Sequence, residues 1–179
     1  MPIFLINIMV EKIEFEELKK IGNVEIRRYP SFLIAKVDGY GDGGFNILFK
    51  FISGKNNSTS EISMTAPVIS QEIEMTEPVL SEGGSIAFVM PSKYSMESVP
   101  KPVDDRIKLV EIPKRTIGVL RFSGRWSTSS FNKKSKQLLE QLAKEKIKTF
   151  GTVFSMRYSS PFTPWFLRRN EVAIEVKLD

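Results

Sequence analysis

The chain has 179 residues, and 26 lysines and arginines against 21 aspartates and glutamates give it a formal net charge of +5 and a pI near 9.4. An apolar fraction of 41% at this length predicts one globular domain with a single hydrophobic core. The sequence contains no cysteine and no histidine. These absences exclude disulfides, thiolate nucleophiles, zinc or iron–sulfur centres built on cysteine, and hydrolase triads that depend on a histidine base.

The distribution of charge and the N-terminal residues indicate which partners to expect. Acidic and basic residues are interspersed along the whole chain, which favours a mixed surface over a nucleic-acid interface. Residues 1–10 are apolar, but ten residues cannot span a bilayer and no basic segment precedes them, so neither a transmembrane helix nor a signal peptide is expected. We therefore expect a cytoplasmic protein without stable membrane insertion, in which residues 1–13 form an N-terminal extension.

The first half of the chain predicts four strands and one helix. Two apolar-rich runs, residues 24–29 and 32–40, are separated by Pro30 and Ser31 and are expected to pair with each other. The next run, residues 45–53, has the length and spacing of a three-turn helix that Gly54 closes. Two more strands are expected to begin at Ile62 and at Ser85.

The second half predicts the same order of elements. Strands are expected at 107–113 and 115–124, a helix at 129–147, and strands at 153–158 and 171–178. Superposing Val24 on Ile107 also places Pro30 on Pro113 and Gly41 on Gly124, which indicates an internal repeat. The predicted fold class is therefore α+β: two duplicated β-β-α-β-β units that form a distorted eight-stranded antiparallel β-barrel with two flanking helices.

The helix at 45–53 is apolar nearly all the way round, because only Asn46, Lys50 and Ser53 are polar. A helix on a sheet needs an apolar arc of only about 100°. Leu48, Ile52 and either Phe45 or Phe51 can supply that arc. The remaining apolar side chains either are covered by another segment or form an exposed groove for a flat hydrophobic ligand, with Lys50 beside it to meet an anionic group.

The helix at 129–147 carries a lysine-rich face. Its core side is expected to comprise Phe131, Leu138, Leu142, Leu139 and Ala143. A solvated surface is the commoner explanation for the lysines, and docking on an acidic membrane or nucleic acid is the less favoured alternative.

Residues 49–68, FKFISGKNNSTSEISMTAPV, combine the first helix, a Gly-Lys-Asn loop and an M-T-A-P-V motif. This segment resembles the hallmark of the SOUL/haem-binding protein family. The runs VEIRRYPSFLIAKV, RFSGRW and FLRRNEVAIEV resemble further family segments in the same order. The resemblance spans about residues 14–176, so residues 14–179 are expected to form one SOUL-like haem-binding domain.

The resemblance implies binding of haem or a related tetrapyrrole in a shallow groove beside the first helix. The family's apolar helix residues would fall on Phe45 and Phe49, with Lys50 as the basic neighbour. Since the chain has no histidine, iron would be held by Tyr, Met or Lys, or the porphyrin would be held by stacking and charge alone. We therefore expect weak, metal-independent binding, and no metal site is predicted.

Residues of the family motifs have structural as well as ligand-binding interpretations. Pro67 suits a strand edge or bulge, whereas Met64 is a candidate groove-lining residue. Arg168 and Arg169 are expected on opposite sides of a strand, so one of them, Arg168, can face the groove and receive a carboxylate. The other, with Asn170 and Glu171, is expected to fix the end of the barrel.

The two tryptophans, Trp126 and Trp165, are expected in the core, with a place in the cleft as the alternative for Trp165.

The expected function is therefore non-catalytic binding or carriage of a tetrapyrrole or a similar flat, hydrophobic, anionic small molecule. One alternative is an effector-sensing or protein-interaction module, because similar barrels bind effectors or partner proteins. A less favoured alternative is an enzyme acting on a hydrophobic ligand. Its acid and base would come from the following carboxylates and tyrosines: Glu171, Glu72, Tyr40, Tyr94 and Tyr158.

Overall fold

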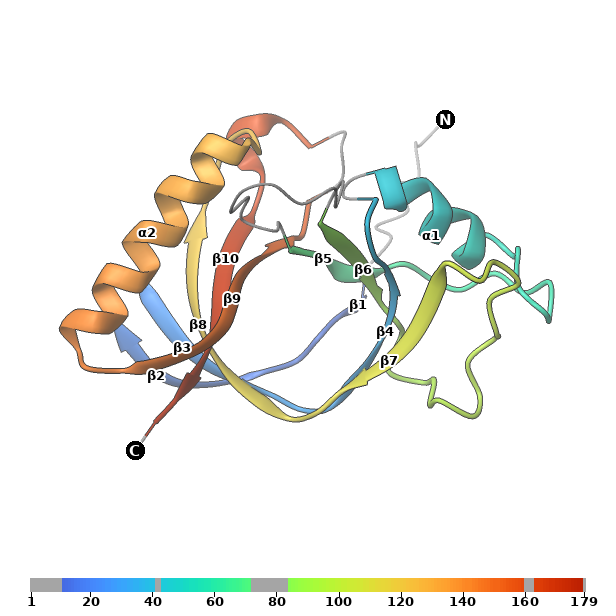
Figure 1. Ribbon diagram of the computed structural model, residues 1–179, viewed down its shortest axis with the longest axis horizontal. Coiled ribbons are helices and arrows are strands. Elements are labelled where there is room, and N and C mark those ends of the chain that lie inside the picture. Colours follow the sequence, from blue (N-terminus) through green and yellow to red (C-terminus); the bar gives the residue numbers. More distant parts are fainter. Residues whose placement is uncertain (1–10, 41–42, 72–83, 160–162, 179) are drawn as a thin grey trace, which may run out of the picture.

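The computed structural model describes residues 11–40, 43–71, 84–159 and 163–178 (Figure 1). In these segments the chain forms a large, mostly antiparallel sheet with two α-helices and one short 3₁₀ turn, so the α+β prediction is confirmed. The first seven elements are β1 (Glu11–Lys12), β2 (Glu16–Ile21), β3 (Val24–Tyr29), β4 (Phe32–Val37), α1 (Gly44–Ile52), β5 (Thr65–Gln71) and β6 (Ser85–Val89). The others are β7 (Ile107–Ile112), β8 (Arg115–Phe122), α2 (Thr128–Lys144), β9 (Lys148–Arg157), η2 (Trp165–Leu167) and β10 (Asn170–Lys177).

Hydrogen bonds place the strands in the order β2-β3-β8-β10-β9-β5-β6-β4-β7, with β1 added in parallel to β5. The predicted pairing of β3 with β4 is wrong. β3 pairs with β8 and β4 pairs with β7, in registers that set Val24 opposite Leu120 and Phe32 opposite Ile112. Pro30 interrupts the chain between β3 and β4, and each strand takes its partner from the other half of the sequence.

The predicted distorted eight-stranded β-barrel is not confirmed, because the sheet that the described residues form has ten strands and is not closed. Closure of the predicted barrel would need β3 to pair with β7. β8 occupies one edge of β3 and β2 occupies the other. The charged strand β2, which the sequence analysis missed, therefore caps the sheet where the barrel would have closed. The order of the elements along the chain is compatible with two β-β-α-β-β units. The internal repeat itself stays a prediction.

The sheet curves strongly, and α1 and α2 lie outside the curve at its two ends (Figure 1). Residues that alternate along each strand divide the core between the two faces of the sheet. On the outer face, α1 covers β4 and β6, and α2 covers β3, β8, β9 and β10. Side chains from both halves meet on the inner face, among them Tyr29, Ile117, Met156, Ile34 and Val89.

Local sequence explains where both helices begin and where α1 ends. At Gly44, the first residue of α1, a Cβ atom would lie 2.6 Å from the Ile86 side chain, so only glycine allows this close approach to β6. Gly54, one residue past the C-cap Ser53, has a φ of +99°, a conformation that favours glycine after a helix. α2 begins with a reciprocal capping box between Ser127 and Ser130.

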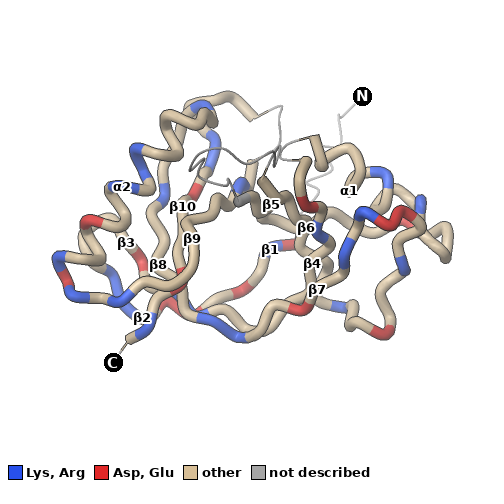
Figure 2. Tube along the Cα trace, in the orientation of Figure 1, with Lys and Arg blue, Asp and Glu red and all other residues tan. Residues whose placement is uncertain are grey.

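The face of α2 that packs on the sheet is narrower than predicted. Phe131, Leu138 and Leu142 are buried as expected, but Leu139 and Ala143 are exposed, so that part of the prediction is wrong. A single narrow stripe along about three turns of the helix covers the sheet beneath it. Lysines follow one another along the outer side of α2, where Figure 2 shows them as blue segments. Among the described residues, no helix is long and apolar enough to cross a membrane.

Candidate ligand-binding site

The outer side of α1 exposes an aromatic surface. Phe49 is 49% exposed, and its ring stacks on that of half-buried Phe45, with ring centroids 6.2 Å apart and planes within 10° of parallel. Phe45 in turn meets the ring of Phe88 in the core edge to face, at 5.1 Å. The exposed ring is therefore fixed in place by a chain of aromatic contacts that reaches into the core.

Only some of the apolar residues of α1 are buried against the sheet. Leu48, Phe51 and Ile52 are buried, so Phe51 rather than Phe45 completes the arc that the sequence left open. Phe45 and Ile47 are partly buried, and Phe49 is the aromatic side chain of α1 that faces solvent. The surplus of apolar residues in this helix is thus reduced to one exposed ring and its stacked neighbour.

Lys50 follows Phe49 on the helix surface and is exposed. Its charge acts on Asp104, whose pKa is lowered to about 2, mainly by a hydrogen bond from Arg106 and in a smaller part by Lys50. Arg106 also binds Asp104 in an ion pair of 2.6 Å. Lys50 and Arg106 therefore both act on the carboxylate of Asp104, which places two cations near this end of the sheet.

Met64 is partly buried and packs against the same core cluster as Phe45. It lies just before β5, where the register against β6 shifts between Thr65 and Val68. The bulge predicted at Pro67 is thus confirmed. Met64 is placed at the edge of the core beneath α1.

The Gly-Lys-Asn loop after α1 is organised by Asn56, which is only 4% exposed. Its side-chain amide donates to the carbonyl oxygens of Phe51 and Ser60, at 3.1 and 2.7 Å. Its side-chain oxygen accepts hydrogen bonds from the backbone N–H groups of Ser58 and Ser60. The asparagine of the hallmark segment therefore fixes the C-terminal end of α1 and the loop after it.

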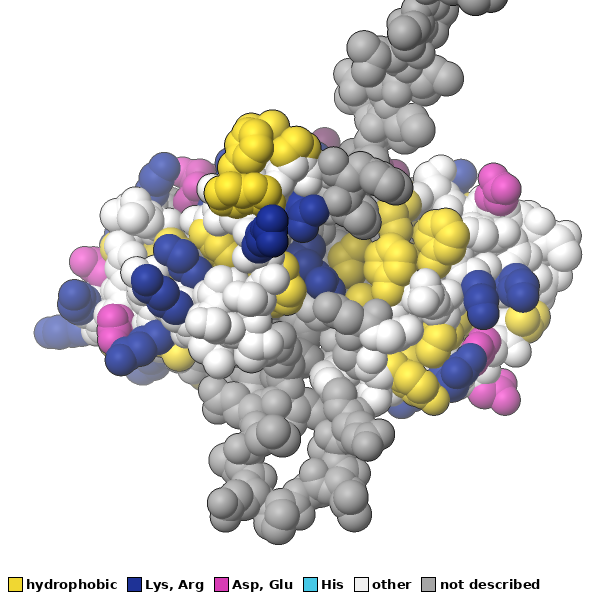
Figure 3. Space-filling model, turned by 90° about the horizontal axis from the view of Figure 1, so that it is seen from above, with side chains coloured by type: hydrophobic (Ala, Val, Ile, Leu, Met, Phe, Trp, Pro, Cys, Tyr) yellow, Lys and Arg dark blue, Asp and Glu magenta, His cyan; other side chains and the backbone are white. Residues whose placement is uncertain are grey.

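Arg168 lies in a different place from the residues of α1. It lines a hollow of about 940 Å³ beneath α2, together with Phe166 and Leu167, and its Nε donates to the carbonyl oxygen of Thr163 at 2.8 Å. The structure thus brings Phe45, Phe49 and Lys50 together and sets Arg168 apart from them. In Figure 3 the apolar surface at α1 and the apolar turn next to Arg168 appear on the same face.

The two tryptophans differ in environment. Trp126 packs between Phe122 and Phe131 under α2, as expected. Trp165 is 52% exposed, so its predicted place in the core is wrong. It belongs to the short turn η2, in which no residue is buried.

The R-R-N-E run forms a buried charge cluster on the inner face of the sheet. Glu171 is fully buried and accepts hydrogen bonds from Arg27, at 2.9 and 3.1 Å, and from Arg169, at 2.9 and 2.7 Å. Arg27 also binds Glu25 at 2.6 Å. Asn170 donates to the carbonyl oxygen of Gly124 at 3.0 Å. The run therefore has the structural role expected for it, and its partner Arg27 was missed by the sequence analysis.

Two tyrosines border this cluster. Burial raises the pKa of Tyr158 far above its usual value, and the charge of Glu171 adds to the increase. Burial also raises the pKa of Tyr29, although the hydrogen bond with Arg27 opposes the increase. Both tyrosines therefore keep their protons, while four N–H bonds occupy the carboxylate of Glu171.

The other candidate acids and bases are dispersed. Tyr40 is exposed beside Arg106, and Tyr94 is packed against the core cluster under α1. Glu72 lies outside the described residues. Within the part of the chain that the structure describes, no group of three or more acidic, histidine or cysteine side chains could hold a metal ion.

Comparison with known proteins gives a family match over nearly the whole chain. A family model described as SOUL heme-binding protein matches residues 10–175. Heme-binding protein 2 of Mus musculus is 27% identical over 172 residues, which cover 87% of this chain and 83% of the relative. Heme-binding protein 2 of Homo sapiens is 26% identical over 166 residues, which cover 84% of this chain and 80% of the relative.

Solved structures with little sequence similarity share the fold. The C-terminal domain of EcmrR superposes with a TM-score of 0.61 at 8% identity, covering 87% of this chain and 98% of that domain. A hydrolase of Listeria innocua superposes with a TM-score of 0.58 at 13% identity, covering 87% of this chain and 92% of the other. Since one fold supports many activities, these two similarities are evidence for architecture alone.

Proposed function

The chain belongs to the SOUL heme-binding protein family, and we propose that it binds a tetrapyrrole, or a similar flat, hydrophobic and anionic molecule, on the exposed side of α1. Membership in the family supports haem or another tetrapyrrole as the ligand class. The position of the ligand and the way it is held are our proposal, and they depend on the side chains of α1.

The observation that carries the proposal is the half-exposed ring of Phe49. A phenylalanine that is 49% exposed on an otherwise well-packed helix gains little for the fold, because its neighbours Leu48, Phe51 and Ile52 already supply the buried arc. Its ring is held parallel to that of Phe45, which presents a preformed aromatic surface. A planar ligand can stack there at little cost in side-chain entropy.

Charge completes the proposed site. Lys50 is next to Phe49 and is exposed, and Arg106 lies nearby through its ion pair with Asp104. The carboxylates of a tetrapyrrole would find these cations at the edge of the aromatic surface. Met64 would support the site from the core side, since it packs on the same cluster as Phe45. Arg168 is not part of this set, because it lines the hollow beneath α2.

The residues present fit the porphyrin ring better than they fit its metal. The sequence has neither histidine nor cysteine. In the described cluster under α1, sulfur and phenol oxygen atoms come from Met64, Met90, Met96 and Tyr94. A bound haem would supply redox and ligand-binding chemistry at its iron. The protein side of the interaction, as we propose it, consists of ring stacking and charge, so a metal-free porphyrin should bind as well as hemin.

We further propose a binding role rather than a catalytic one. The buried carboxylate of Glu171 is occupied by Arg27 and Arg169, and the raised pKa values of Tyr29 and Tyr158 remove both tyrosines as bases at neutral pH. These groups also lie on the inner face of the sheet, whereas α1 covers the outer face. Glu171 and Tyr158, two of the groups expected to do acid–base chemistry, are thus separated from the proposed ligand surface.

The proposal is tested by titrating the protein with hemin and with metal-free protoporphyrin, following the Soret band. Wild type should bind both one to one, and Phe49→Glu should weaken both at least about tenfold, because it removes the stacking ring and repels the carboxylates. Phe150→Glu is the matched control, since Phe150 is 47% exposed on β9 and lies outside the proposed site. Absence of saturable binding, or equal loss in both variants, would refute the proposed site.

A further inference from the structure

The turn η2 displays three consecutive large apolar side chains to solvent. Trp165 is 52% exposed, Phe166 is 57% exposed and Leu167 is 65% exposed. Single exposed apolar residues are common on protein surfaces, but a contiguous group of this size marks a contact surface. None of the three takes part in the core, and the fold itself gives no reason for their apolar character.

The turn is a structured element. The N–H of Leu167 donates to the carbonyl oxygen of Pro164 at 2.9 Å, and the rings of Trp165 and Phe166 pack edge to face at 5.6 Å. On its C-terminal side the Arg168 guanidinium binds Thr163, and the Arg169 N–H donates to the hydroxyl of Ser159 at 2.8 Å. The apolar side chains are therefore held outward by a fixed backbone.

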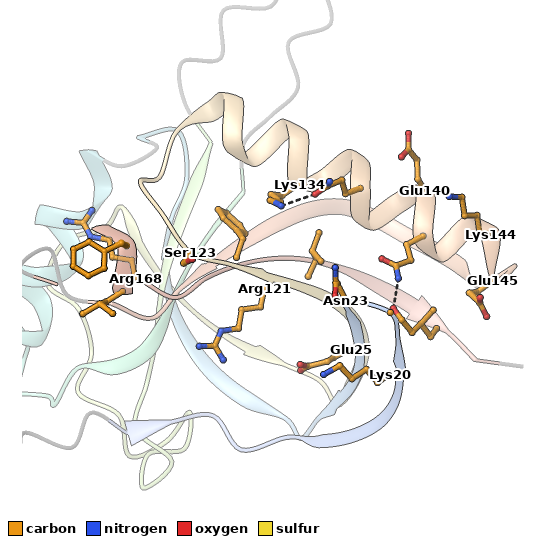
Figure 4. Close-up of a pocket in the computed structure, with 18 residues that line it drawn as sticks. Lys20, Asn23, Glu25, Arg121, Ser123, Lys134, Glu140, Lys144, Glu145 and Arg168 are labelled. Atoms are coloured by element: carbon orange, nitrogen blue, oxygen red, sulfur yellow. Dashed lines mark hydrogen bonds between the residues drawn. The ribbon is translucent and has the colours of Figure 1, made fainter. Parts of the chain in front are cut away.

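Basic side chains adjoin this apolar turn. Phe166 and Leu167 line one end of the hollow beneath α2, and Figure 4 shows that this hollow runs along the helix past Lys134 towards Lys144. The basic residues of the hollow are Lys20, Arg121, Lys134, Lys144 and Arg168, against the acidic residues Glu25, Glu140 and Glu145. Figure 3 shows dark-blue basic side chains directly beside an apolar protrusion of the surface.

Charge decides what kind of surface the turn would meet. Five basic side chains line the hollow against three acidic ones, which gives it a positive balance. Lys133 and Lys136, on the neighbouring turns of α2, are exposed as well. Together with the net charge of +5, this balance favours an anionic partner that also accepts apolar side chains.

We propose that Trp165, Phe166 and Leu167 form a membrane-docking turn that inserts into the headgroup region of an anionic phospholipid bilayer, with the neighbouring lysines and arginines on the lipid phosphates. Tryptophan favours this interfacial depth, and basic residues add electrostatic attraction to anionic lipid. The proposal uses residues other than those of the tetrapyrrole site, so either can fail without the other. It describes a peripheral contact through a turn.

The test is sedimentation of the protein with vesicles of phosphatidylcholine, alone or with about 30% phosphatidylglycerol, at low and at high salt. Wild type should sediment with the anionic vesicles, should be released by salt, and should show a blue shift of Trp fluorescence on binding. A variant with Trp165→Ser, Phe166→Ser and Leu167→Ser should lose at least about tenfold in partitioning, because it removes the inserted apolar area. Since these side chains are exposed, the variant should keep the wild-type circular dichroism spectrum.

A matched control replaces exposed apolar residues elsewhere, with Phe150→Ser and Leu178→Ser, and should bind vesicles like wild type. Equal binding to neutral vesicles, or an unchanged partition of the triple serine variant, would overturn the proposal. Concentration-dependent dimerisation that the triple variant abolishes would instead assign the turn to a contact between two copies. Loss of porphyrin binding by the triple variant without vesicles would assign it to the ligand site, and both outcomes contradict membrane docking.

Discussion

Replacing Arg27 by methionine should destabilise the protein strongly, although Arg27 lies far from the proposed ligand surface. The Arg27 side chain is 2% exposed and forms two hydrogen bonds to Glu171, which is fully buried. Burial lowers the pKa of Arg27, but the hydrogen bonds and the charge of Glu171 more than offset this effect and leave its pKa raised. The Arg27 guanidinium therefore stays charged in the folded protein, where the Glu171 carboxylate binds it.

The magnitude follows from what Arg27→Met leaves behind. Glu171 would keep its bonds from Arg169 but would lose two of its four donors in a site without solvent. Removing one partner of a buried ion pair costs about 3–5 kcal/mol, because the remaining charge is left under-compensated. Since Arg169 still compensates part of the charge, the lower end of this range, about 3 kcal/mol, is expected.

Urea unfolding followed by circular dichroism measures this loss. With a slope of about 2 kcal/mol per molar urea, typical for a chain of this size, the midpoint should fall by about 1.5 M. Arg28→Met is the matched control, since Arg28 follows Arg27 on β3 and binds Glu16 at 3.1 Å in a pair whose side chains are 40% and 64% exposed. An exposed pair contributes about 0–1 kcal/mol, so this variant should stay near wild type.

A double replacement distinguishes the loss of the ion pair from the loss of packing that the shorter methionine causes. Arg27→Met combined with Glu171→Leu removes both charges, and its loss of stability should be smaller than the sum of the two single losses by about 1–3 kcal/mol. If Arg27→Met costs no more than Arg28→Met, or if the two single effects simply add, the buried pair does not stabilise this fold and the reasoning is wrong.

Two further predictions concern the loop after α1 and the tyrosines of the inner face. Asn56→Ala should lower the free energy of unfolding by about 2–4 kcal/mol, measured by urea unfolding. The reason is that four backbone groups lose their hydrogen bonds to Asn56, which is only 4% exposed. A loss of less than about 1 kcal/mol would show that water replaces the amide. Burial raises the pKa of Tyr158 and of Tyr29, so both tyrosines stay protonated in the folded chain. In the unfolded chain the same side chains ionise above about pH 10. The free energy of unfolding should therefore fall as the pH rises above that value. Tyr158→Phe should remove about 1.4 kcal/mol of the fall in stability between about pH 9 and 11, measured by urea unfolding at each pH. An unchanged pH dependence would contradict the raised pKa.

Local sequence was sufficient to predict the positions of several strands but not which strands pair with each other. Apolar-rich runs bounded by turn residues located β3, β4, β7 and β8. Partner choice depends on contacts between distant parts of the chain, so the apparent β3–β4 hairpin could not be distinguished from the observed β3–β8 and β4–β7 pairs.

The missed strand β2 has a different explanation. Its sequence, EELKKI, is charged and mostly exposed, so it lacks the apolar alternation of a strand with one buried face. A signal was nevertheless present, because Gly22 and Asn23 separate Ile21 from Val24, which pair in the structure. Two turn residues of this kind between two runs are typical of a β-hairpin.

The charge cluster shows the same limit at the level of single residues. Arg27 and Glu171 are 144 positions apart, and nothing in the run VEIRRY distinguishes the buried Arg27 from the exposed Arg28 except the alternation of faces. The neighbours Val24 and Ile26 pack under α2, which places Glu25, Arg27 and Tyr29 on the inner face together. A charged residue on that face required a partner, but only the fold identifies it as Glu171.

The motifs that carry the family resemblance contain residues that hold the fold together and residues that are proposed to meet a ligand. Asn56 fixes a loop, Pro67 accompanies a bulge, and Glu171 anchors a buried ion cluster, so these positions explain why the chain adopts this fold. Phe49 and the turn η2 have the opposite character, because their side chains are exposed and contribute little to the packing. A sequence that kept the first set and changed the second would be expected to keep the fold and bind something else. Family membership therefore predicts the scaffold of this protein more strongly than its ligand, and the exposed aromatic residues are where the identity of that ligand has to be tested.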